Sequence, residues 1–179
     1  RRGRRRRGLV LRLRRGDRPL ELLVVEVPVS LYAHEAAVNT ARFSPDGTLL
    51  ATAGDDGRIY LWKKGVLASE DPEPIILTGH KGKVVNLAFS DDGSLLASAS
   101  WDGSVGLWPL DGGLESAAVD SRFIFGHDGP VNMVQFAPNG THLYSAGYDG
   151  QIRYWKLSNG EYLRSVVRNG WSVSVMSVD

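Results

Sequence analysis

The chain has 179 residues, of which 42% are hydrophobic, and this is enough for one domain with a buried core. It contains no Cys, which excludes disulfides, thiolate metal sites and a cysteine nucleophile. The net charge of +1 is unevenly divided: residues 1–18 hold ten Arg against one Asp, whereas residues 19–179 hold 11 Lys and Arg against 19 Asp and Glu. No run of about 18 apolar residues occurs, so no membrane-spanning helix is expected.

Residues 1–19 form an Arg-rich leader that we expect to be disordered. The chain begins at Arg1 rather than Met, so we expect either a piece of a longer protein or a misassigned start. The leader could neutralise phosphates of nucleic acid or of another anionic surface, or act as a localisation signal. A solvated tail without function and translation of normally non-coding sequence remain open as alternatives.

Residues 20–179 contain three ungapped copies of one unit, at 34–62, 80–108 and 127–155. Each copy runs from a His to a Trp 28 residues later, and successive Trp residues lie 46 and 47 apart. Internal repeats of this length are the sequence signature of a repeat architecture. The segment therefore predicts one structural unit used three times.

Each copy predicts three strands, and the first copy illustrates them. The apolar-rich stretch 38–43 ends at Ser44-Pro45-Asp46-Gly47, a combination typical of a turn. Residues 49–53 are small and branched, and Asp56-Gly57 after them indicates a tight hairpin. Side-chain polarity alternates along residues 59–62, which is the pattern expected of a strand. The other copies place Asp-Gly or Asn-Gly pairs at the same two turns.

A fourth strand is predicted between copies, at 74–77 and 122–125, with 24–31 in the same place before the first copy. Residues 160–179 are expected to begin a further unit, with 160–164 as its linking strand. Two apolar positions recur in all copies and are expected in the core between sheets: Phe43, Phe89 and Phe136, and Leu50, Leu96 and Leu143.

A four-stranded unit with Gly-His near its start and Trp near its end resembles the WD-repeat family. The resemblance implies an all-β fold: a fragment of a WD-repeat β-propeller with four-stranded antiparallel blades, three complete and a fourth begun. Two departures are present. Ala33 stands before His34 in place of Gly, and Lys63, Pro109 and Lys156 follow the Trp residues where the family has Asp.

The resemblance also implies a hydrogen-bonded tetrad inside each blade, in which Trp, a hydroxyl, His and Asp follow one another. The predicted tetrads are His34, Thr52, Asp56 and Trp62; His80, Ser98, Asp102 and Trp108; and His127, Ser145, Asp149 and Trp155. The same side chains invite a hydrolase hypothesis, but a catalytic triad needs one set in one cleft. Three sets at one spacing favour architecture, and no catalytic residue, metal ligand or cofactor site is predicted.

In WD-repeat proteins the narrow top face carries binding, and the resemblance assigns three positions per blade to it. Here they are Ala37, Asn39 and Asp55; Lys83, Val85 and Trp101; and Pro130, Asn132 and Tyr148. Trp101 and Tyr148 stand out because aromatic side chains dominate binding hot spots. The alternative, that both pack on a neighbouring loop, remains open.

We therefore expect a non-catalytic scaffold for protein–protein interaction, with protein partners, no cofactor, no small-molecule substrate and no membrane association. One alternative is a sensor or regulatory propeller of a larger enzyme or redox protein. Another is a propeller associated with chromatin or RNA, in which only the Arg-rich leader would contact nucleic acid. A cytoplasmic location is expected, with the periplasm and the nucleus left open.

Overall fold

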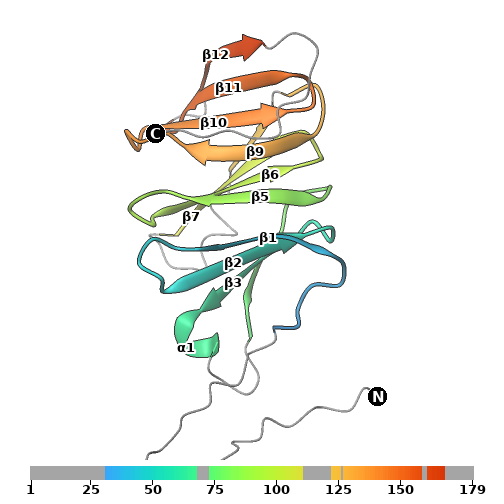
Figure 1. The fold of residues 1–179 in the computed structure, drawn as a ribbon, viewed down its shortest axis with the longest axis vertical. Coiled ribbons are helices and arrows are strands. Elements are labelled where there is room, and N and C mark those ends of the chain that lie inside the picture. The colour runs from blue at the N-terminus through green and yellow to red at the C-terminus, as the bar shows by residue number, and fades with distance from the viewer. Residues whose placement is uncertain (1–30, 68–72, 111–121, 126, 159–160, 168–179) are drawn as a thin grey trace, which may run out of the picture.

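The computed structural model describes residues 31–67, 73–110, 122–125, 127–158 and 161–167. These residues form three four-stranded antiparallel sheets, which follow one another along the longest axis of the molecule (Figure 1). The Arg-rich leader, most of the strand expected at 24–31 and the last part of the partial repeat, 168–179, lie outside the described residues.

The first blade contains four strands in chain order: β1 (Val38–Phe43), β2 (Leu49–Gly54), β3 (Ile59–Lys63) and β4 (Ile75–Leu77). Its two hairpin turns place Gly47 and Gly57 at φ values of 66° and 73°, which explains why glycine occupies both turns. A single helical turn, α1 (Lys64–Leu67), follows β3.

The other two blades repeat this order. The second contains β5 (Val84–Phe89), β6 (Leu95–Ser100), β7 (Ser104–Pro109) and β8 (Arg122–Phe125). The third contains β9 (Val131–Phe136), β10 (His142–Gly147), β11 (Gln151–Lys156) and β12 (Glu161–Val167). In every blade the outer strand comes from the linking segment that follows the Trp. The predicted all-β fold with four-stranded antiparallel blades is confirmed.

Two apolar layers join the three blades. Strand alternation gives each sheet two different faces, one with small and branched side chains and one with larger side chains that include the Trp. The first layer contains Ala51, Ala53, Ile59 and Leu61 of the first blade and Val84, Leu87, Leu96 and Trp108 of the second. The second contains Ala97, Ala99, Val105 and Leu107 of the second blade and Val131, Val134, Leu143 and Trp155 of the third.

Phe43 corrects one sequence expectation. Phe136 is buried and Phe89 packs against the first apolar layer, but Phe43 is 64% exposed. The two later Phe side chains lie on the face that meets the preceding blade. Phe43 holds the same position in the first blade, and no described sheet precedes it. The prediction of a core role for all three was therefore wrong for Phe43.

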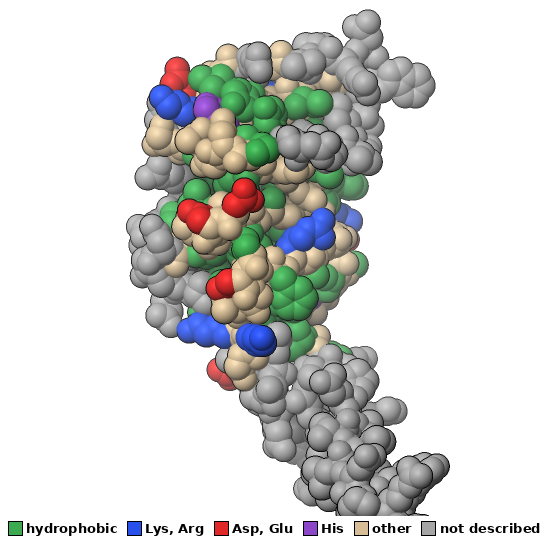
Figure 2. Space-filling view, turned by 60° about the vertical axis from the view of Figure 1, so that its left-hand side comes forward, with side chains coloured by type: hydrophobic (Ala, Val, Ile, Leu, Met, Phe, Trp, Pro, Cys, Tyr) green, Lys and Arg blue, Asp and Glu red, His purple; other side chains and the backbone are tan. Residues whose placement is uncertain are grey.

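Polar side chains stabilise the first turn of each of the first two blades. Asp46 accepts hydrogen bonds from the Ser44 hydroxyl at 2.6 Å and the Thr48 amide at 3.0 Å, and Asp92 does the same with Ser90 and Ser94. The serine hydroxyl, followed by the amide and hydroxyl of Thr48 or Ser94, lowers the pKa of each carboxyl to about 2. Figure 2 brings the left-hand side of Figure 1 forward, and acidic side chains stand out there at successive levels of the molecule.

Candidate functional site

The second blade shows how the four recurring polar side chains meet. The Trp108 indole Nε1 donates to the Ser98 Oγ at 2.9 Å, and this oxygen lies 2.7 Å from the His80 Nε2. The His80 Nδ1 lies 3.0 Å from the Asp102 Oδ2. Ser98 and Trp108 are fully buried, so these bonds satisfy polar atoms that water does not reach.

The same four positions meet in the other two blades, at His34, Thr52, Asp56 and Trp62 in the first and at His127, Ser145, Asp149 and Trp155 in the third. The indole-to-hydroxyl distance is 3.1 Å in the first blade and 2.7 Å in the third. The hydroxyl-to-imidazole distance is 3.0 Å and 2.7 Å, and the imidazole-to-carboxylate distance is 2.9 Å in both.

Burial and hydrogen bonds together set the charge states of His80, His127 and Asp102. Burial lowers the pKa of His80 and of His127, since a charged imidazole would lose its hydration. Burial pushes the pKa of Asp102 upward, but hydrogen bonds from the Ser104 hydroxyl and the Lys81 amide outweigh it and leave that pKa lowered. A neutral imidazole therefore donates from Nδ1 to an ionised carboxylate and accepts the serine hydroxyl at Nε2.

This geometry speaks against the hydrolase hypothesis. The Ser98 hydroxyl is the atom that a triad would use as nucleophile, and it is fully buried. It also accepts the indole N–H. A nucleophile must reach the substrate in an open cleft, and this oxygen is enclosed between strands.

Two further polar side chains join the tetrads, and sequence reasoning did not identify either. In the second blade the Ser104 hydroxyl donates to Asp102 at 2.5 Å, and in the third the Arg153 Nη2 donates to Asp149 at 3.2 Å. They stand two and four residues after the tetrad Asp. Each lies an even number of residues before the tetrad Trp on the same strand, so strand alternation places it on the face that carries the tetrad. This spacing is the signal that could have identified both residues.

The nine predicted top-face positions lie around the second hairpin turn of each blade. In each blade a backbone amide beside the tetrad Asp donates at 2.9 Å to the carbonyl of the residue three after the tetrad His: Asp55 to Ala37, Trp101 to Lys83, and Tyr148 to Pro130. Asn39 is exposed, whereas Val85 and Asn132 are half-buried. The structure thus places the members of each predicted set close to one another.

Contacts between blades connect four of these side chains in a row. The Lys83 Nζ lies 2.6 Å from the Asp55 Oδ2 and 5.4 Å from the centre of the Trp101 ring. The rings of Trp101 and Tyr148 meet edge to face, with centroids 6.3 Å apart and an interplanar angle of 90°. Trp101 is 45% exposed and Tyr148 is 53% exposed. The two rings therefore contact each other across neighbouring blades, and about half of their surface stays open to solvent. Contact of these rings with a partner stays a prediction. We name Asp55, Lys83, Trp101 and Tyr148 the rim row.

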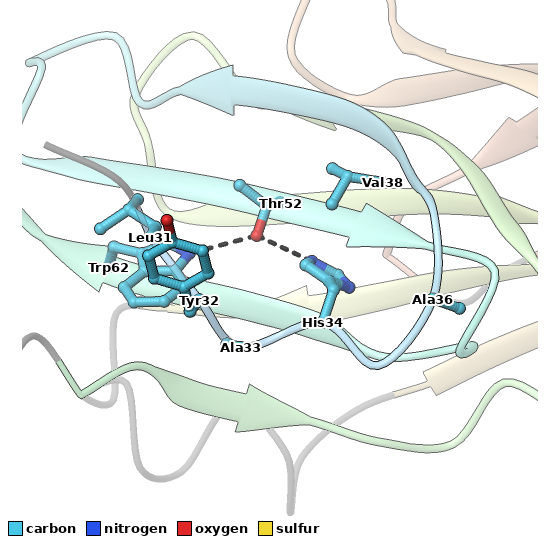
Figure 3. Close-up of a pocket in the computed structure, with 8 residues that line it drawn as sticks. All are labelled: Leu31, Tyr32, Ala33, His34, Ala36, Val38, Thr52 and Trp62. Atoms are coloured by element: carbon cyan, nitrogen blue, oxygen red, sulfur yellow. Dashed lines mark hydrogen bonds between the residues drawn. The ribbon is translucent and has the colours of Figure 1, made fainter. Parts of the chain in front are cut away.

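The first blade carries an open hollow of about 180 Å³ beside its tetrad (Figure 3). Its wall includes Leu31, Tyr32, Val38, Thr52 and Trp62. The Thr52 hydroxyl at its base is already bonded to the His34 imidazole and the Trp62 indole, as the dashed lines show. The remaining wall is mostly apolar, so the hollow offers a surface for packing rather than a reactive group.

Two kinds of structure are absent from the described residues. They contain no group of three or more His, Cys, Asp or Glu side chains arranged to hold a metal ion. None of the helices that they form is long and apolar enough to cross a membrane.

Comparison with known proteins gives consistent results. The sequence matches the family described as WD domain, G-beta repeat at residues 26–63, 73–109 and 120–156. It is 48% identical over 52 residues to a chromatin assembly factor 1 subunit of Mus musculus, a match that covers 29% of this chain and 9% of the relative. It is 55% identical over 38 residues to the corresponding protein of Schizosaccharomyces pombe, covering 21% and 7%.

Solved structures show the same fold. Those described as the structure of U3-55K and the crystal structure of RRP9 WD40 repeats each superpose with a TM-score of 0.68 at 21% identity. Each match covers 79% of this chain and 42% of the solved chain. The chain thus spans less than half of these structures and less than a tenth of the two curated relatives.

Proposed function

From the premise that this chain belongs to the WD domain, G-beta repeat family, whose repeats generally form scaffolds for protein interaction, we propose a non-catalytic platform that binds a protein through the rim row. The observation that carries the proposal is the exposed pair of Trp101 and Tyr148, which directly follow β6 and β10 in two neighbouring blades. Aromatic rings on rigid turns offer a large contact area at a small entropic cost.

Rigidity around the pair supports this role. The amides of Trp101 and Tyr148 are both tied to a neighbouring carbonyl at 2.9 Å. Each is followed directly by the tetrad Asp of its blade, whose carboxylate is fixed by a buried imidazole. A partner would therefore meet side chains that are already in place, and binding would cost little ordering.

The test is capture of partners by the full-length protein and by a variant that carries both Trp101→Ala and Tyr148→Ala. We expect the double variant to bind the captured partner at least about tenfold more weakly, because truncated hot-spot aromatics each cost about 2 kcal/mol or more. Its thermal unfolding should change little, since both rings are half exposed. Ile76→Ala is the matched control, because Ile76 is 46% exposed on the outer strand β4. Undiminished capture by the folded double variant would refute the proposed site.

A more specific proposal concerns the setting of that interaction. Several curated relatives are named as a subunit of chromatin assembly factor 1, with 46–55% identity over 38–52 residues. We propose on this basis that the partner is a protein of chromatin assembly and that the protein works in the nucleus. Nucleic acid would be contacted only by the Arg-rich leader.

Two readouts test this setting. Tagged protein should co-purify with chromatin-assembly proteins from a nuclear extract, and the Trp101→Ala and Tyr148→Ala double variant should not. Replacing the leader's Arg residues by Gln should weaken salt-dependent DNA binding and leave partner capture unchanged, because arginine contacts to phosphates release counterions. A tagged protein that stays outside the nucleus would contradict the proposal.

A further inference from the structure

The rim row already holds a cation. The Lys83 ammonium of the second blade reaches across to the first blade and lies 2.6 Å from the Asp55 carboxylate. The same ammonium stands 5.4 Å from the centre of the Trp101 ring, within the range of a cation–π contact. A carboxylate and an indole face therefore flank one positive charge.

The two flanking groups are fixed independently of this cation. The Asn39 side-chain amide donates to the second Asp55 oxygen at 2.8 Å, and the same amide is tied to the Val84 carbonyl at 3.1 Å. Tyr148 contacts the Trp101 ring edge to face. If Lys83 turned away, the carboxylate and the indole would both stay where they are.

Lys83 is held much less firmly than these groups. Its side chain is 45% exposed, and that of Asp55 is 26% exposed. Exposed ion pairs contribute little to stability, because water screens them and a long side chain loses rotamer freedom. The hydrogen bond from Lys83 lowers the pKa of Asp55, so the carboxylate is ionised at neutral pH. An incoming cation would therefore find a charged acceptor with an exchangeable occupant.

Building on the proposed function, we propose that Asp55 and Trp101 form a receptor for an arginine side chain of a basic partner segment, and that Lys83 is a resident cation which the arginine displaces. A guanidinium is planar, so it can stack on an indole and pair with a carboxylate through two parallel hydrogen bonds, which an ammonium cannot do. Overall charge agrees with this choice, because residues 19–179 carry 19 acidic against 11 basic side chains.

Removing the Lys83 ammonium should then strengthen the binding of an arginine peptide. The experiment measures fluorescence anisotropy of a labelled peptide, Gly-Gly-Arg-Gly-Arg-Gly-Gly, with the full-length protein and its Lys83→Met variant, which keeps an unbranched side chain but removes the charge. We expect affinity to rise roughly three- to tenfold in the variant, as expected for loss of an exposed ion pair and a weak cation–π contact. Lys81→Met removes another exposed lysine two residues away and should change nothing.

Two further arms test the receptor itself. Asp55→Asn and Trp101→Ala should each weaken peptide binding at least about fivefold, and a citrulline version of the peptide, which is neutral and of the same shape, should not bind. Thermal unfolding of each variant confirms that it is folded. Weaker binding of the arginine peptide by Lys83→Met would overturn the inference, and so would tighter binding of a glutamate peptide by the unmodified protein, because Lys83 would then serve an acidic partner.

The outcome separates this inference from the proposed function. Loss of partner capture in the Trp101→Ala and Tyr148→Ala double variant, together with unchanged peptide affinity in Lys83→Met, would refute the arginine receptor alone. Full partner capture by the double variant would refute the proposed function, whatever the peptides do.

Discussion

Replacing Ser98 by Ala tests whether the tetrad stabilises its blade. The Ser98 hydroxyl serves two partners, the Trp108 indole at 2.9 Å and the His80 imidazole at 2.7 Å. Without the hydroxyl, a buried donor and a buried acceptor lose their hydrogen bond, and each such loss costs about 1–3 kcal/mol. Allowing for some relaxation, we expect the free energy of unfolding to fall by about 2–4 kcal/mol.

The measurement is urea and thermal denaturation of the full-length protein and its Ser98→Ala variant, followed by tryptophan fluorescence. For a chain of this size, 1 kcal/mol shifts Tm by about 2–4 °C, so a fall of roughly 5–15 °C is expected. Ser98→Thr is the matched control, because the first blade uses Thr52 at the same position with the same bonds. A loss below about 0.5 kcal/mol in Ser98→Ala, or an equal loss in Ser98→Thr, would refute the reasoning.

Three other predictions concern charge and space. In an NMR titration the carboxyls of Asp46 and Asp92 should stay ionised down to about pH 2. Their stabilising effect should be complete above the usual pKa of 3.8 and should be lost as pH falls from there through about 2. Titration midpoints near 4 would contradict this. The lowered pKa values of His80 and His127 mean that the unfolded chain binds protons first. Stability should therefore decline as pH falls below about 6.5, and a free energy of unfolding that stays constant from pH 7 to pH 5 would argue against buried neutral imidazoles. Gly147→Ala should lower Tm, because the new Cβ would lie 2.7 Å from the His127 Nδ1; an unchanged Tm would show that the third blade can yield there.

The sequence was informative wherever short-range rules determine the structure. Turn pairs such as Asp56-Gly57 fix hairpins locally, so the strands around them could be located. The spacing from His80 to Trp108 repeats without a gap, and the strand register then places Ser98 and Trp108 on one face of the sheet. For these reasons the strands of each blade could be predicted without coordinates.

Contacts between blades could not be predicted in this way. Lys83 meets Asp55 across 28 residues of chain and from a different sheet, and no local pattern encodes that pairing. Phe43 holds the same position in its repeat as two Phe residues that are packed between blades. Its exposure depends on what precedes the first blade, and the repeat itself does not encode that. Both features depend on long-range neighbours, which propensity and periodicity do not describe.

The fourth strand of each sheet comes from the segment after the Trp that ends the sequence repeat, and this has a consequence for how such chains change in length. Each sheet closes with a strand that stands before the next His, as β4 and β8 do. Excising residues 63–108, which make up one period of 46 residues, would therefore leave every surviving sheet with four strands. Duplication or loss of a whole period in the gene would preserve complete hydrogen-bond ladders at the junction, so such proteins can gain or lose modules without passing through an unfoldable intermediate.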